Sequence, residues 1–335
     1  MPKKFKAWFC AQGDQQLEGI DFFKMYVPLV QWTTVRLLPI LEILLDLKSK
    51  QRDVTAAFLH GKLGEDERVY VKMPLVLRKE RKVLKLNKTL YGLRQSPRVF
   101  WKYLTNAMLA VGMEVSKLDP CLFIGNRVMA VAFVNDILFW STDQAYINKL
   151  GSKLREQGLL LEQEDDAAGY LGVKMTKTED GHIEMKQTGL IDRIVEALGL
   201  DSKLSTSKWT PAEATPLTRD EGGEPPQGSF SYSSVVGMLL YLSGHSRPDI
   251  AYAVNCCVRS MFNPRLSHEK ALKQIGRYLK ATRDKGLVLN PSGQLKVLTL
   301  LDCMAMKRLP IRLGRRVVQG FCILFLIAQW CGYPG

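Results

Sequence analysis

Two aspartates stand where the chain could build a divalent-metal site. Asp53 precedes VTAAFL near the end of an expected strand, and Asp136 lies in an expected hairpin turn. Hard cations such as Mg²⁺ prefer carboxylate oxygens, and a pair of such ions can activate an attacking hydroxyl and hold a leaving phosphate. If one sheet brings both acids together, the chemistry is nucleotidyl transfer. Aspartate is common in turns, so an ordinary structural role is the stronger alternative on spacing alone.

The segment AFVNDILFW, residues 132–140, predicts the hairpin. Asn135 and Asp136 tolerate the positive φ that a two-residue turn needs, and the apolar flanks predict two buried strands. Turn chemistry accepts Asn or Asp at position 135, so folding provides no reason for the amide there.

The composition favours an anionic partner. The 335 residues include 47 Lys and Arg against 33 Asp and Glu, a formal net charge of +14. Nucleic acid is the commonest partner of such a protein, although a merely basic protein is an alternative. The length allows two or three domains with their own cores.

Cysteines and apolar runs exclude other classes. The seven cysteines include no C-x-x-C pair, and no histidine lies at metal-site spacing, which argues against structural zinc. We expect reduced thiols in an intracellular compartment. The start lacks the apolar core of a secretory signal. The longest apolar run near the end, residues 320–328, is far below the roughly 20 residues that span a bilayer, so we expect no membrane partner.

Hydrophobic periodicity predicts the elements that position the two acids. We expect helices within 29–48, where Pro39 starts or kinks the helix, then after Pro97, within 146–158 and within 189–200, and two or three more within 231–282. We expect strands within 52–61, 68–74 and 121–142, with turns at Gly125–Asn126 and Asn135–Asp136, and a hairpin within 167–187 that turns at Asp180–Gly181.

The helix expected over residues 268–282 carries a basic face. Lys270, Lys273, Arg277 and Lys280 recur along one side of it. A basic helix face is usually only solvated, but beside a nucleic-acid site it could grip a phosphate backbone.

Seven strings in order resemble the reverse transcriptase of copia-type retrotransposons. They are DVTAAFLHGKL, VLKLNKTLYGLRQSPRVFWK, DPCLF, AFVNDILFW, YLGVKM, VVGMLLYLSGHSRPDIAYAV and NPRLSHEKALKQIGRYLKAT. The resemblance implies an α+β right-hand polymerase with fingers, palm and helical thumb. It implies Mg²⁺ or Mn²⁺ as cofactor and, as partners, an RNA or DNA template–primer and deoxynucleotides. It also implies that the protein is located in the cytoplasm, in virus-like particles, or in the nucleus.

The resemblance implies roles for the acids and their neighbours. Asp53 and Asp136 match metal-binding catalytic residues, and Asn135 stands where the Tyr-x-Asp-Asp hairpin of the family has its first aspartate. Phe58, which follows Ala57, matches the ring that lies under the incoming sugar and leaves no room for a 2′-hydroxyl.

The resemblance also implies contacts to nucleotide and primer. Gln95 and Arg98 match the motif that contacts the nucleotide and template. Tyr170, Leu171 and Gly172 match the segment that positions the primer end.

The chain departs from the family at three places. Asn135 is neutral and offers one oxygen, and the loss of one negative charge at a metal site lowers the rate by on the order of 10² to 10⁴. Trp8 and Gln12 stand where the family has arginines for the triphosphate. Asp302 could match the first acid of a ribonuclease H domain, but no Asp or Glu follows it, and a shifted reading frame is the simplest explanation.

These matches predict four regions and leave three interpretations. The regions are fingers and palm (1–200), a linker or surface loop (201–230), a helical thumb or connection (231–290) and a poorly packed, degenerate start of ribonuclease H (291–335). The chain is an RNA-directed DNA polymerase domain, impaired in this copy, or an inactive nucleic-acid-binding remnant, or the poorly folded product of a decayed element.

Deletion of residues 303–335 should leave thermal unfolding of the remaining chain almost unchanged, because this segment lacks the acids of the domain it would begin. Scanning fluorimetry of the full and shortened chains is expected to give midpoints within about 2 °C, which corresponds to less than about 1 kcal/mol. A larger fall would show that the tail is part of a folded core.

Overall fold

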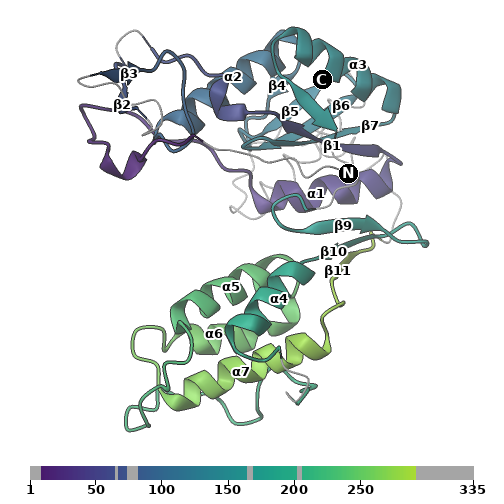
Figure 1. The fold of residues 1–335 in the computed structure, drawn as a ribbon. Coiled ribbons are helices and arrows are strands. Elements are labelled where there is room, and N and C mark those ends of the chain that lie inside the picture. Colours follow the sequence, from purple (N-terminus) through teal and green to yellow (C-terminus); the bar gives the residue numbers. More distant parts are fainter. Residues whose placement is uncertain (1–8, 65–66, 74–81, 164–168, 202–205, 292–335) are drawn as a thin grey trace, which may run out of the picture. The chain divides into compact units, whose positions relative to one another are not determined.

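A computed structural model describes residues 9–64, 67–73, 82–163, 169–201 and 206–291 (Figure 1). These residues form two compact units, one that ends at Asp166 and one that runs from Ala167 to Pro291. Trp8 and the predicted ribonuclease H remnant beyond residue 291 lie outside the described residues. The predicted division into fingers, palm and thumb stays a prediction.

The first unit is built on a six-stranded antiparallel sheet in the order β4-β5-β6-β7-β1-β8. Its strands are β1 (Lys48–Val54), β4 (Glu114–Val115), β5 (Leu122–Gly125), β6 (Val128–Phe133), β7 (Asp136–Ser141) and β8 (Leu161–Gln163). The other elements are η1 (Gly13–Gln15), α1 (Trp32–Leu44), η2 (Ala57–Leu59), α2 (Ser96–Ala110), α3 (Gln144–Glu156) and a separate strand pair, β2 (Tyr70–Lys72) with β3 (Val83–Lys85).

Helices cover both faces of this sheet, with α1 on one side and α2 and α3 on the other (Figure 1). Side chains alternate along a strand, so Ile137 and Phe139 of β7 join the core that includes Phe100 of α2. Trp140 points to the opposite face, where its indole donates to Glu42 of α1 at 2.8 Å. The central strands are therefore buried on both sides. This burial explains why the residues before and after the predicted Asn135–Asp136 turn are apolar.

The hairpin between β6 and β7 is confirmed, but its turn lies one residue earlier than predicted. Phe133 pairs with Asp136, so Val134 and Asn135 form the two-residue loop, and Asp136 is the first residue of β7. Val134 has a φ of 54°, which is unusual for a β-branched residue. Strand pairing has outweighed the local turn preference of Asn and Asp.

The other predicted turns show the same contrast between local preference and pairing. Gly125 pairs with Val128, so the loop there is Asn126–Arg127 rather than Gly125–Asn126. The turn predicted at Asp180–Gly181 is confirmed, because both lie in the loop that a hydrogen bond from Thr178 to the His182 carbonyl closes.

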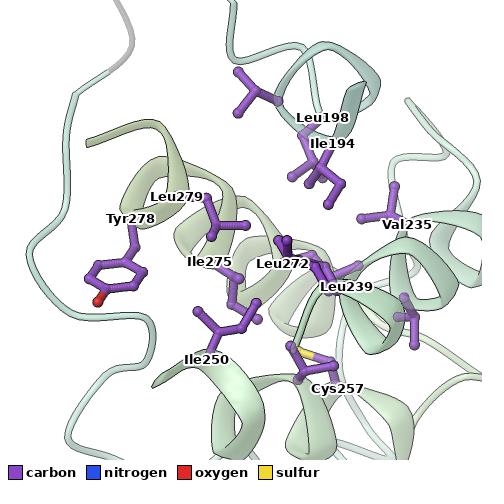
Figure 2. Packing of buried hydrophobic residues seen from close by; sticks show 14 of the residues in the cluster. Ile194, Leu198, Val235, Leu239, Ile250, Cys257, Leu272, Ile275, Tyr278 and Leu279 are labelled. Atoms are coloured by element: carbon purple, nitrogen blue, oxygen red, sulfur yellow. The ribbon is translucent and has the colours of Figure 1, made fainter. Parts of the chain in front are cut away.

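The second unit combines helices with a three-stranded antiparallel sheet in the order β11-β10-β9. Its elements are β9 (Lys174–Lys177), β10 (Ile183–Lys186), α4 (Thr188–Ala197), α5 (Tyr232–His245), η4 (Pro248–Ile250), α6 (Ala251–Val258), α7 (Leu266–Ala281) and β11 (Leu287–Leu289). Side chains of all four α-helices meet in one core (Figure 2). Within the predicted loop, Ala212, Leu217 and Phe230 pack against that core.

An ion pair between the buried Arg247 and the more exposed Asp249 fixes the chain at the end of α7. The Arg247 side chain is 2% exposed and donates to Asp249 at 2.8 Å, to the Thr282 hydroxyl at 2.7 Å and to the Thr282 carbonyl at 2.9 Å. The Tyr278 hydroxyl also donates to Asp249 at 2.7 Å. Burial raises the pKa of Asp249, but the hydrogen bonds from Arg247 and Tyr278 and the charge of Arg247 together hold it below its usual value.

A second buried polar group holds the loop before α5 against α7. The His268 ring nitrogens lie 2.8 Å from the Thr218 carbonyl oxygen and 2.8 Å from the Arg265 amide nitrogen. Glu269, 2% exposed, accepts from the amides of Gln227 and Gly228. The string SHEKAL therefore has a structural role in this unit.

The described residues include free thiols at Cys10, Cys121, Cys256 and Cys257. Across the same residues, every helix is too short or too polar to cross a membrane.

Asp249→Asn should lower the free energy of unfolding by about 1–3 kcal/mol at neutral pH, because Arg247 then lacks a charged partner while it stays buried. A carboxyl with a lowered folded-state pKa stabilises the fold above its unfolded pKa, and this contribution is lost as pH falls through the folded value. Urea unfolding at neutral and acid pH should therefore show a difference that narrows with acid. Asp284→Asn, at a pair with an 83% exposed carboxylate, is the control and should change stability by less than about 0.5 kcal/mol.

Candidate functional site

Asp53 and Asp136 lie directly opposite each other on β1 and β7. Both side chains are half-buried, and residues opposite each other in an antiparallel pair place their Cβ atoms about 4.5–5.5 Å apart on one face. Glu162 of β8 is the other cross-strand neighbour of Asp53, and its side chain is exposed. The structure thus brings the two predicted acids together at one end of their strands.

Asn135 contacts this pair directly from the hairpin loop. Its side-chain amide donates a hydrogen bond to the Asp53 carboxylate. Its backbone carbonyl accepts a hydrogen bond from the backbone amide of Val54 at 2.8 Å. An aspartate at this position would present a second negative oxygen to Asp53 in place of a donor. The amide therefore pairs with one of the oxygens that a cation would need.

The donor set fits one hard cation better than two. Among the described residues, no three His, Cys, Asp or Glu side chains are grouped so that they could hold a metal ion. Mg²⁺ is commonly bound through one or two carboxylates, with waters and substrate phosphates completing the shell. Asp53 and Asp136 meet that requirement for a single ion. A second ion would have to share these two carboxylates.

Phe58 and Ala57 follow Asp53 in the short helix η2. Ala57 is 2% exposed and belongs to the core, and its contact with a nucleotide stays a prediction. The half-buried Phe58 ring meets Phe100 edge-on at 6.1 Å and Tyr91 edge-on at 5.1 Å. The Phe58 carbonyl accepts from the Thr89 hydroxyl at 2.5 Å. The ring is thus held between two others.

Gln95 and Arg98 begin α2 but differ in exposure. Gln95 is 1% exposed, and its side chain accepts from Gln16 and donates to the Asp21 carbonyl, both at 3.1 Å. Arg98 is half-buried in the first turn of the helix. The nucleotide contact of Gln95 stays a prediction, and it would require the buried side chain to become accessible.

Tyr170, Leu171 and Gly172 form a tight turn within the second unit. Tyr170 is fully buried and bridges to Val173. Leu171 and Gly172 have φ values of 57° and 69°. The Leu171 carbonyl accepts from the Tyr241 hydroxyl at 2.7 Å. The turn is therefore firmly held, and its role with a primer stays a prediction.

The basic face of α7 divides into two kinds of residue. Lys280 donates to the Leu200 carbonyl at 2.7 Å, and the Lys273 ammonium lies over the Phe230 ring. Lys270 and Arg277 instead line a cavity of about 710 Å³ between α7, α6 and the loop of residues 208–220. The sequence predicted the stripe, whereas the structure separates the cations that bond within the unit from those that line the cavity.

Tyr91 is a candidate that the sequence analysis did not select. Burial raises the pKa of its phenol, and the negative charges of Asp53 and Cys10 raise it further. Tyr91 thus lies near both Asp53 and the Phe58 ring. Only its place inside the string TLYGLRQSP could have drawn attention to it.

Comparison with known proteins assigns the class. Residues 1–214 match the family described as reverse transcriptase (RNA-dependent DNA polymerase). The match covers more than half of the chain, so the chain belongs to the reverse transcriptase family.

The relatives are transposon proteins. The chain is 32% identical over 296 residues to the retrovirus-related Pol polyprotein from transposon TNT 1-94 of Nicotiana tabacum, which covers 83% of this chain and 22% of that protein. It is 30% identical over 301 residues to the corresponding polyprotein from transposon RE1 of Arabidopsis thaliana, at 88% and 20%. The chain thus spans about one fifth of these polyproteins. It covers 82% of the putative transposon Ty5-1 protein of Saccharomyces cerevisiae, at 27% identity over 75% of this chain.

A double variant in which both Lys270 and Arg277 are changed to Gln should bind a primer–template duplex more weakly. The salt dependence of that binding should also be smaller. Each phosphate contact that is lost lowers the slope of log K against log salt by about 0.9 for a duplex, so the pair should lower it by about 1.8. Fluorescence anisotropy over a salt series measures the slope. Lys280→Gln is the control and should leave it nearly unchanged, and equal effects at both places would contradict the division of the α7 face.

Proposed function

We propose that this chain is the RNA-directed DNA polymerase domain of a copia-type retrotransposon polyprotein, with impaired catalysis. The observation that carries the proposal is the direct pairing of Asp53 with Asp136 beside the loop that holds Asn135. The family match supports the polymerase class. A right-hand arrangement of fingers, palm and helical thumb belongs to the proposal, as does a cytoplasmic or nuclear location.

The residues of the site have separate tasks in this proposal. Asp53 and Asp136 would hold a divalent metal, Mg²⁺ or Mn²⁺. When bound, such a metal neutralises charge on the triphosphate and lowers the pKa of the attacking hydroxyl. Phe58 would exclude a 2′-hydroxyl by filling its space, while Gln95 and Arg98 would contact the nucleotide and template.

The nucleic-acid contacts of the proposal lie in both units. Tyr170, Leu171 and Gly172 would position the primer end in the second unit. There Lys270 and Arg277 of α7, which line the cavity, would neutralise backbone phosphates. Such contacts provide affinity that does not depend on metal chemistry, because phosphate neutralisation and counterion release govern it. Binding and catalysis can therefore be lost separately.

Asn135 is the reason to expect weak catalysis. Its amide donor satisfies the Asp53 carboxylate without a metal and adds no charge to attract one. Neutral amides are poor substitutes for carboxylates as ligands of hard divalent cations, which prefer charged oxygens. The same hydrogen bond favours the second candidate function, an inactive remnant that binds primer–template but does not extend it.

Asn135→Asp should raise Mg²⁺-dependent primer extension by at least about 10²-fold, the lower end of what one lost metal ligand changes in rate. The substitution restores a charge with almost no change in volume. Binding to primer–template should stay nearly as it was, because phosphate contacts elsewhere supply it. Single-nucleotide extension on an RNA template, with Mg²⁺ and then Mn²⁺, measures the rate.

Asn126→Asp is the matched control, because it makes the same chemical change in the exposed loop of the neighbouring hairpin. It should leave extension unchanged. No gain from Asn135→Asp with binding intact would favour the inactive remnant. No binding by either form would contradict both candidate functions and leave the interpretation of a decayed product.

A further inference from the structure

The segment TLYGLRQSP, residues 89–97, presents one aromatic side chain to the candidate site. Gln95 and Ser96 are each 1% exposed, and the Ser96 hydroxyl donates to the Leu90 carbonyl at 2.6 Å. Leu93 is 4% exposed. The ring of Tyr91, in contrast, is half-buried and contacts Phe58. Tyr91 is therefore the aromatic side chain through which this segment meets the Phe58 ring, while the Thr89 hydroxyl reaches the Phe58 carbonyl.

The Phe58 ring depends on Tyr91 for one of its two aromatic supports. On one side it meets Phe100, which is 1% exposed and fixed in the core. On the other side the Tyr91 ring approaches at 5.1 Å with the planes at 74°, a favourable edge-to-face geometry. Removal of the Tyr91 ring would leave Phe58 free to turn toward the vacated space.

The backbone around Tyr91 contacts two other segments of the first unit. The Ala11 amide donates to the Tyr91 carbonyl at 2.7 Å. Gly92 has a φ of 88°, and a Cβ there would lie 2.0 Å from the Ala11 carbonyl oxygen. The Thr89 hydroxyl ties the same segment to the Phe58 carbonyl. These contacts tie the segment that carries Tyr91 to Ala11 on one side and to Phe58 on the other.

We infer that Tyr91 is a positioning residue for nucleotide selection, which holds the Phe58 ring where it excludes a 2′-hydroxyl. The inference rests on the proposed function, because it gives Phe58 the task of selecting the sugar. The inference adds Tyr91 to the site, because the family motif was matched to Gln95 and Arg98 and does not include it.

Binding rather than turnover provides the test, since turnover is expected to be weak. The full chain is loaded with a primer–template that ends in a dideoxynucleotide, so that no extension follows. The dissociation constants of dATP and ATP opposite a complementary template base are then measured, and their ratio gives the sugar discrimination. Phe58→Ala serves as the reference that removes the selecting ring.

Tyr91→Ala should lower the discrimination by about two- to tenfold, the range expected for losing one aromatic pair contact. Tyr91→Phe keeps the ring and should restore the discrimination of the unchanged chain. Tyr103→Ala is the matched control, because Tyr103 lies on α2 of the same unit but stacks on His60. It should leave the ratio unchanged. Tyr91→Leu, which keeps bulk without a ring, replaces Tyr91→Ala if that variant does not fold, and should also lower the ratio.

The outcomes separate the two proposals. If Phe58→Ala lowers the discrimination and Tyr91→Ala or Tyr91→Leu does not, the inference on Tyr91 is wrong and the proposed function stands. A fall with Tyr103→Ala as large as that with Tyr91→Ala would also overturn the inference, because general loosening of the unit would explain both. If the unchanged chain does not bind dATP in a template-dependent way, the proposed function fails and the inference fails with it.

Discussion

The antiparallel register between β1 and β7 is the constraint on which the candidate site depends. Asp53 and Asp136 meet only because this pairing sets them opposite each other. A slip of one residue would send one of them to the other face. Burial prevents that slip, because Ile137 and Phe139 must face α2 and α3 while Trp140 meets Glu42 of α1. The hydrophobic core therefore fixes the geometry of the polar site.

Asn135 fits this fold without a charge at the tip of the hairpin. Its side-chain amide donates a hydrogen bond to Asp53, and Asn and Asp have almost the same volume, so the fold would accept either residue at this position. The turn itself depends on Val134, whose positive φ the flanking strands impose. Because the buried strands hold the hairpin, we expect the stability of the fold to depend little on the charge at position 135. Metal chemistry, in contrast, depends on that charge directly.

Local sequence preference failed where distant contacts decide. Turn propensity placed the hairpin tip at Asn135–Asp136, but cross-strand pairing moved it one residue earlier. The sequence also gave no sign of the partners that Gln95 and Lys280 have within the fold. Gln95 bonds to Gln16 and to the Asp21 carbonyl, which lie more than 70 residues away, and Lys280 donates to the Leu200 carbonyl. No periodicity or motif spacing reports such contacts, and the roles of both residues with nucleic acid stay predictions.

The sequence by itself predicted most of the helices, the hairpins and the resemblance to the family, because periodicity and long motifs are local properties of the chain. It also showed that position 135 carries no charge. It did not predict the short strands β4, β8 and β11, whose partners lie in other segments. The tertiary structure alone decided that Asp53 faces Asp136, that the Asn135 amide binds Asp53, and that Tyr91 supports Phe58. Each of these contacts joins segments far apart in the chain, and their proximity follows from the packing of helices on a sheet rather than from any local pattern.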